Sequence, residues 1–81
     1  MSEISHIESE IVRLSAAIEE QPDAARLYYE RGRLYWKCGR RGEAISDYEH
    51  AASLDPDSPA ATALAQARDI MDFYNTDLYN P

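Results

Sequence analysis

The chain has few of the residues on which covalent or metal chemistry depends. A single cysteine among 81 residues excludes an internal disulfide and a cysteine-based metal cluster. Only three glycines are present, and they form no glycine-rich phosphate loop. The two histidines lack the spacing of metal ligands. These shortages argue against an enzyme, and they predict neither a cofactor nor a metal site.

Long apolar runs are absent as well. No stretch approaches the roughly 20 apolar residues that a bilayer-spanning helix needs. The start of the chain is acidic and lacks the basic and apolar segments of a secretory signal. We therefore expect no membrane segment, and a cytoplasmic location is the default. At this length the sequence predicts one small domain, near the lower limit for burying a core of its own.

Charge is distributed unevenly along this acidic chain. The formal net charge is −7, but residues 24–41 carry six of the eight basic residues against one acidic residue. The six are Arg26, Arg31, Arg33, Lys37, Arg40 and Arg41. Such a segment either attracts an acidic partner or pairs with the acidic helices on either side. Nucleic acid is disfavoured as a partner, because the whole chain would be repelled by phosphates.

Helix-forming residues dominate, and β-branched residues are sparse, so we predict an all-α fold of about four helices. The expected helices cover residues 3–20 (or 6–20), 24–38, 43–54 and 59–74. Each carries one apolar stripe at three- and four-residue steps. The stripes comprise Ile4, Ile7, Ile11, Leu14, Ala17, Ile18, then Leu27, Tyr28, Leu34, Tyr35, then Ala44, Ile45, Tyr48, Ala51, Ala52, and finally Ala60, Leu64, Ala67, Met71, Tyr74.

Capping and turn residues mark where these helices begin and end. Ser5, with a glutamate three residues later, has the spacing of a capping box. Asp23 is a natural N-cap for the second helix, and Ser58 followed by a proline predicts the start of the fourth. Gly39 stands where a left-handed residue ends a helix. Gly42 is expected to form a second flexible joint.

A period of 34 residues separates Pro22 from Pro56, and a similar apolar motif precedes each proline. This period is typical of stacked helical hairpins. Residues 25–58 resemble a tetratricopeptide repeat. The matching residues are Tyr28, Gly32, Tyr35, Ala44, Tyr48, Ala51 and Pro56. Arg31 departs from the pattern, which prefers an aliphatic residue there; we expect its charge to stay in water.

The resemblance implies a single domain of antiparallel helical hairpins, as in an α-α superhelix, that acts as a protein–protein interaction module. Only one repeat is complete. The expected parts of the domain are residues 1–22 (the second helix of a partial repeat), 23–57 (the complete hairpin), 58–75 (a capping helix) and 76–81 (a tail). The shortage of repeats leaves a second interpretation open, namely a structural module that associates with itself as a homodimer.

The resemblance places one face of the second helix on the concave groove of the repeat, and its residue types suit a protein or peptide partner, in particular an acidic one. The candidate partner-binding residues are Arg26, Tyr29, Arg33, Trp36 and Lys37. Alternatively, Trp36 packs against a neighbouring helix and the cations pair with nearby acids. Some family members clamp a peptide carboxylate with Lys and Asn where this chain has Tyr29 and Arg33, so that clamp does not carry over.

The sequence contains one weak candidate pair for catalysis, Cys38 and His50. They fall at the end of one predicted helix and late in the next, without an orienting third group. We therefore interpret Cys38 as a half-buried structural residue and His50 as a surface residue.

Overall fold

The computed structural model describes the backbone of residues 3–75 and the side chains of residues 5–72, so the tail at 76–81 and the side chains of Ile4 and Tyr74 lie outside the described part. Four α-helices follow one another: α1 (Glu3–Glu20), α2 (Ala25–Lys37), α3 (Arg41–Leu54) and α4 (Ala60–Asn75). No strand occurs within residues 3–75. The predicted all-α fold is confirmed.

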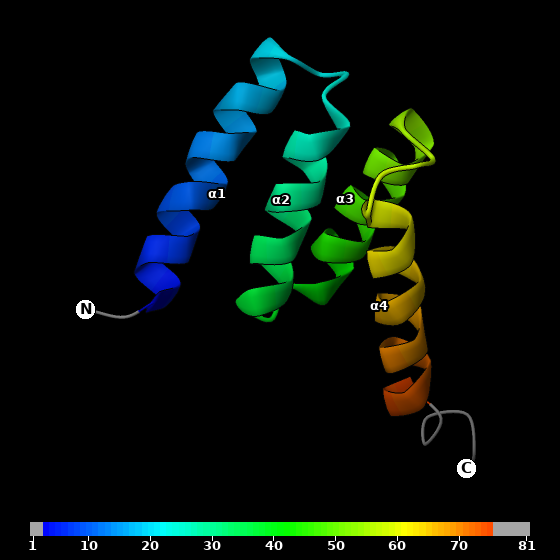
Figure 1. Cartoon of the computed structure of the whole chain (residues 1–81). Coiled ribbons are helices and arrows are strands. Elements are labelled where there is room, and N and C mark those ends of the chain that lie inside the picture. The colour runs from blue at the N-terminus through cyan, green and yellow to red at the C-terminus, as the bar shows by residue number, and fades with distance from the viewer. Residues whose placement is uncertain (1–2, 76–81) are drawn as a thin grey trace.

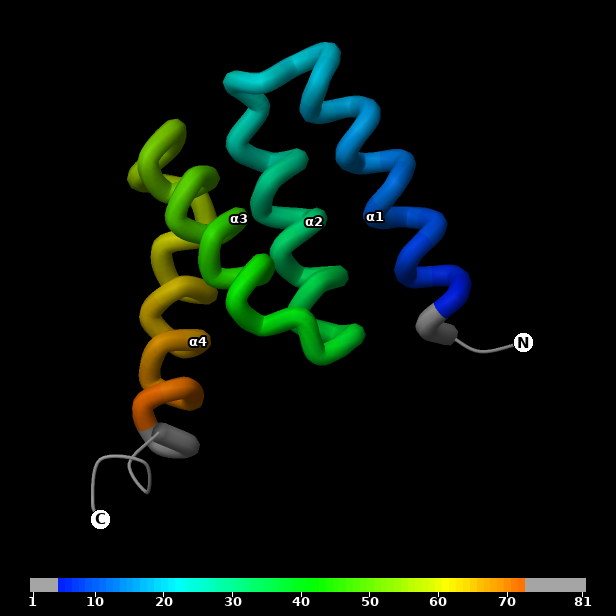
Figure 2. The backbone as a smooth tube through the Cα atoms, turned by 180° about the vertical axis from the view of Figure 1, so that it is seen from behind, coloured from blue at the N-terminus to red at the C-terminus, as the bar shows by residue number. Residues whose placement is uncertain are grey.

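Each helix packs against the next one in the chain, and the interface between α2 and α3 is the most extensive (Figures 1 and 2). Short connections make consecutive helices antiparallel. Since α2 and α4 each run antiparallel to α3, they run in the same direction as one another (Figure 1). This arrangement places α2 between α1 and α3, and α4 packs on the far side of α3.

Two predicted helix boundaries are confirmed by the backbone. Gly39 has a φ of 87°, in the left-handed region, and the amide of Arg40 reaches back to the carbonyl of Tyr35 at 2.8 Å. This is the geometry in which glycine ends a helix. At the start of α4, the Ser58 hydroxyl accepts a hydrogen bond from the amide of Ala60 at 3.2 Å. Ser58 is therefore the N-cap, as predicted.

Three other boundary predictions were wrong. Ser5 lies inside α1, which begins at Glu3. Asp23 is not the N-cap of α2, because a hydrogen bond from the Ala24 amide to the Gln21 carbonyl places Asp23 within a turn. Gly42 lies within α3, not in a flexible joint. Arg40 and Glu43 form a bidentate ion pair across its first turn, at 2.6 Å for both contacts, and the Ala44 amide donates to the Arg40 carbonyl at 3.1 Å.

The core consists of two clusters along the predicted stripes. The buried residues of the first are Leu14, Ile18, Leu27, Tyr28, Ala51 and Ala60, and those of the second are Ala44, Tyr48 and Ala67. The first cluster joins all four helices near the start of α2. The second joins α3 to α4 beneath the second half of α2. Together they hold α2 in a fixed position relative to α4.

Gly32 allows α2 and α3 to approach closely. A Cβ atom at this position would lie 2.8 Å from Cε1 of Tyr48 and 3.2 Å from the carbonyl oxygen of Ala44. Real Cβ contacts are longer than this, so any side chain here would displace the tyrosine ring. The sequence prediction that Gly32 supports a close helix approach is confirmed.

The expectation that the charge of Arg31 stays in water was wrong. Its guanidinium donates two hydrogen bonds to Asp47 of α3, each 2.8 Å long, and a third of 3.1 Å to the Ser15 hydroxyl of α1. Asp47 is only 5% exposed. The hydrogen bond to Asp47 raises the pKa of Arg31. A buried carboxylate needs a charged hydrogen-bond partner, and Arg31 is that partner for Asp47. Because Arg31 belongs to α2 and contacts both α1 and α3, it links the three helices.

Candidate functional site

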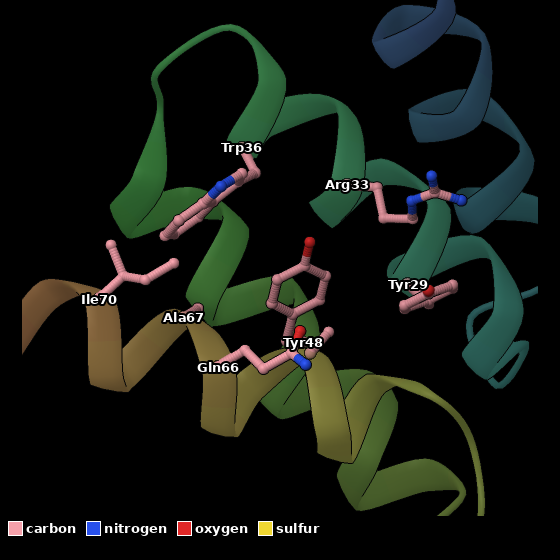
Figure 3. Close-up of a pocket in the computed structure, with 8 residues that line it drawn as sticks. Tyr29, Arg33, Trp36, Tyr48, Gln66, Ala67 and Ile70 are labelled. Carbon is pink, nitrogen blue, oxygen red and sulfur yellow. The ribbon is translucent and has the colours of Figure 1, made fainter.

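A cavity of about 210 Å³ opens between α2 and α4, with α3 beneath it (Figure 3). It is lined by Tyr29, Arg33 and Trp36 of α2, Tyr48 of α3, and Ala63, Gln66, Ala67 and Ile70 of α4. Three of the five predicted site residues therefore share one cavity. They do so because positions 29, 33 and 36 lie on one face of a helix with 3.6 residues per turn.

Tyr48 forms the floor of this cavity. Its side chain is 5% exposed, and Figure 3 shows its hydroxyl directed towards the space between Trp36 and Arg33. The hydroxyl forms no hydrogen bond with any other residue of the described range. Burial raises the pKa of Tyr48, so the hydroxyl stays protonated and remains a hydrogen-bond donor at neutral pH.

Arg33 supplies the charge of the cavity. Its guanidinium lies 5.9 Å from the centre of the Tyr29 ring, within the range of a cation–π contact. Among the described side chains, no carboxylate forms an ion pair with Arg33. None of the described residues that line the cavity is acidic. Arg33 also lines the cavity between α1 and α2, together with Glu10 and Glu30, and Figure 3 shows its guanidinium directed towards α1.

Trp36 is half-buried. It packs against the second core cluster while one part lines the cavity, and the guanidinium of Arg41 lies 5.0 Å from its ring. The tryptophan is therefore neither sealed inside nor free of the core. An apolar surface held in place in this way loses little conformational freedom when it binds a partner.

The remaining two predicted residues lie at neighbouring cavities. Lys37 lines a cavity of about 340 Å³ between α1 and α2, and Arg26 lines one of about 470 Å³ at the starts of α2 and α4. Arg26 pairs with Glu30 at 3.1 Å, as expected for cations that bind nearby acids. Tyr29 lines all three cavities and so lies at their meeting point.

Sequence reasoning missed the wall that α4 provides. Gln66 and Ile70 face the cavity, and Ile70 is 40% exposed although it is apolar. We expected α4 only to cap the array, because it lacks the aromatic residues of the repeat. Ile70 follows Ala67 at the three-residue step of the apolar stripe of α4. This spacing was the signal in the sequence that could have indicated an apolar wall beside the cavity.

The pair considered for catalysis is not brought together. Cys38 lies at the end of α2, where its thiol donates to the Tyr35 carbonyl at 3.4 Å. His50 stacks on Tyr28 at the opposite end of the hairpin, with ring centres 4.0 Å apart. Within the described side chains, no group of three or more His, Cys, Asp or Glu is arranged to hold a metal ion.

None of the helices described by the structure combines the length and the apolar composition that crossing a membrane requires.

A comparison with protein families matches residues 25–58 to the tetratricopeptide repeat. The matched segment is the hairpin of α2 and α3, and the resemblance seen in the sequence is confirmed. Repeats of this family generally mediate protein–protein interaction and are non-catalytic. Searches among curated proteins and among solved structures gave no match.

Proposed function

We propose that this chain, whose hairpin at residues 25–58 matches the tetratricopeptide repeat, binds an acidic peptide segment of a partner protein in the cavity between α2 and α4. Arg33 pairs with a carboxylate of the peptide. Tyr29 and Trp36 contact its neighbouring apolar groups. Lys37 extends the binding face into the adjoining cavity between α1 and α2, and Arg26 borders the other adjoining cavity, where it pairs with Glu30.

The observation that carries this proposal is that Arg33 forms no ion pair with a carboxylate of the described residues. Within the described part of the chain, ion pairs with carboxylates are formed by Arg13, Arg26, Arg31, Arg40 and Arg68. In a chain with 15 acidic residues, Arg33 nevertheless lines a cavity to which no described residue contributes a carboxylate. A carboxylate from a partner would complete the pair.

The geometry favours a carboxylate over a neutral ligand. A guanidinium can bind both carboxylate oxygens, and hydrogen bonds to charged groups contribute about 1.5–3 kcal/mol each. The Tyr48 hydroxyl and the Gln66 amide add donors on the far side of the cavity. Arginine, tyrosine and tryptophan are also the residues most often found at the centre of protein interfaces.

Calorimetric titration with a short peptide, two glutamates flanking a leucine, tests the proposal. The variant Arg33→Gln should bind about tenfold more weakly, equivalent to about 1.4 kcal/mol. The matched control is Arg68→Gln, because Arg68 is an exposed cation that pairs with Glu49 away from the cavity. Equal losses in both variants, or no binding by the wild-type chain, would contradict the proposal.

Self-association is the alternative, and the exposed apolar residues at the ends of the array favour it. Val12 on α1 is 69% exposed, and Ile70 on α4 is 40% exposed. Exposed apolar patches often mark protein interfaces. Sedimentation velocity across a concentration series distinguishes the two functions. A chain that stays monomeric at every concentration would exclude the homodimer and leave the peptide site intact.

A further inference from the structure

Two of the cavities meet at Tyr29, and we take them together as the two ends of one groove. The cavity at Arg26 is lined by the first turns of α2 and by the α3–α4 connection (55–59), and the cavity at Arg33 by later turns of α2 together with α3 and α4. Both include Tyr29. Figure 1 shows that α2 and α4 run in the same direction, and Tyr29 is the residue that the two cavities share.

The two ends of this groove have opposite charge. At the first end lie three carboxylates and one guanidinium, and Arg26 pairs there with Glu30. That leaves Asp55 and Asp57, neither of which forms an ion pair with a described residue. Asp55 accepts only a backbone hydrogen bond, from the amide of Asp57 at 3.1 Å. At the second end lies Arg33, which forms no ion pair with a described residue.

A hydroxyl that reaches the cavity surface lies at the positive end. Tyr48 is 95% buried, and its hydroxyl has no hydrogen-bond partner among the described residues, yet it faces the cavity beside Arg33 (Figure 3). A ligand oxygen at this end could accept hydrogen bonds from both the hydroxyl and the guanidinium.

The middle of the groove is apolar. Ala25 and Pro59 line its first half, and the Tyr29 ring lies between the two charged ends. A ligand that fits must therefore present a cation, an apolar group and an anion in that order along the groove. An extended peptide carries such groups at regular intervals.

We propose that the groove selects a peptide of mixed charge, with a basic residue at Asp55 and Asp57 and an acidic residue at Arg33. This inference rests on the proposed function and specifies its ligand. The α2 residues at the two ends are centred about five positions apart, or about 8 Å at the rise of a helix. An extended peptide covers that distance in about two to three residues.

The charges also weaken the binding of peptides whose two charged residues have the same sign. A doubly acidic peptide would place one carboxylate against Asp55 and Asp57, and a doubly basic peptide would place a cation against Arg33. Selection in this groove therefore comes from repulsion as well as attraction. A doubly acidic peptide still binds through Arg33, but more weakly than a mixed one.

Four peptides of equal length, with leucine and alanine between the charges, test the inference by fluorescence anisotropy. Their charged residues, three positions apart, are Lys and Glu, Glu and Lys, Glu and Glu, or Lys and Lys. At least one mixed peptide should bind five-fold or more tightly than both like-charged peptides. Which mixed order binds better reports the direction of the peptide in the groove.

The variant Asp55→Asn/Asp57→Asn should reduce this preference to less than two-fold, while Arg33-dependent binding of the doubly acidic peptide remains. Asparagine keeps the side-chain oxygen that accepts the backbone hydrogen bond at Asp55. The control Glu19→Gln/Glu20→Gln changes net charge by the same amount at the end of α1, and it should keep the preference.

The outcomes separate the two proposals. If the doubly acidic peptide binds through Arg33 as tightly as either mixed peptide, the mixed-charge inference is overturned and the proposed function stands. The inference is also overturned if the mixed preference survives in the aspartate variant. If no peptide binds, the proposed function itself is overturned.

Discussion

Two arginines of α2, only two positions apart, have opposite environments. Arg31 lies between α1 and α3 and is fully engaged with Asp47 and Ser15. Arg33 faces the groove and pairs with no carboxylate of the described chain. Residues two apart on a helix point in nearly opposite directions, so one helix can hold the fold together on one face and bind a partner with the other. Pairing, not residue type, distinguishes the two roles.

The largest expected effect is on the free energy of unfolding, and it comes from Asp47→Ala. This substitution would remove the partner of Arg31. A guanidinium left partly buried without its carboxylate is costly, and removing one member of a buried pair typically costs 3–5 kcal/mol. Because the Arg31 side chain is 20% exposed, we expect a loss of about 2–3 kcal/mol in the free energy of unfolding. Urea denaturation followed by circular dichroism measures it.

The matched control is Glu43→Ala, which breaks the exposed bidentate pair with Arg40. Its effect on unfolding should be much smaller, since water screens exposed pairs. Similar losses from Asp47→Ala and Glu43→Ala would contradict the distinction between the buried and the exposed arginine.

The next effect concerns the close contact on the α3 side of the same helix. Gly32→Ala would gain some helix propensity but place a methyl group 2.8 Å from the Tyr48 ring. Overpacking of this kind costs typically about 1–3 kcal/mol, so we expect a net loss of about 1–2 kcal/mol. The control Gly42→Ala, where a Cβ atom meets nothing within 4 Å, should leave thermal stability unchanged or raise it. A stabilised Gly32→Ala variant would contradict the predicted clash.

A smaller effect is expected from pH, through the tyrosine beneath the groove. Burial raises the pKa of Tyr48 above its ordinary value of 10.0. The folded state therefore holds the proton more tightly than the unfolded state. Its contribution to stability is complete below pH 10 and is lost as pH rises through the folded pKa. Denaturation midpoints measured upward from pH 9 should fall less steeply for Tyr48→Phe than for the wild type. Equal slopes would contradict the raised pKa.

The smallest effect on stability should come from the groove face. Arg33→Ala removes a side chain without an ion pair, so the free energy of unfolding should change by no more than about 0.5 kcal/mol. The same variant should lose peptide binding. A substitution that is neutral for folding but costly for binding separates the two faces of α2. A loss comparable to that of Asp47→Ala would show that Arg33 is structural.

Local patterns predicted the fold well because local chemistry determines it. The four helices, the left-handed Gly39 and the Ser58 cap all depend on neighbouring residues, and so they could be read from the sequence. The Arg31–Asp47 pair could not, because it joins residues 16 positions apart across two helices. The start of α3 was misplaced because Gly42 indicated a break, whereas α3 already begins at Arg41.

The candidate site could be predicted in part for the same reason. Helical spacing places Tyr29, Arg33 and Trp36 on one face, and the structure brings these three to one cavity. The contribution of α4 depends on how the second core cluster packs α3 against α4, which no local pattern specifies. Tyr48 was recognised as a core residue, but its hydroxyl at the floor of the cavity depends on that same packing.

The most direct test follows the side-chain Nε–Hε signals of the arginines by NMR during titration with the doubly glutamate peptide. We predict that the Arg33 signal shifts progressively and saturates, whereas the signal of Arg31, held by Asp47, stays in place. A shift of Arg31 with Arg33 unchanged, or no shift of either at saturating peptide, would contradict the assignment of binding to the groove face of α2.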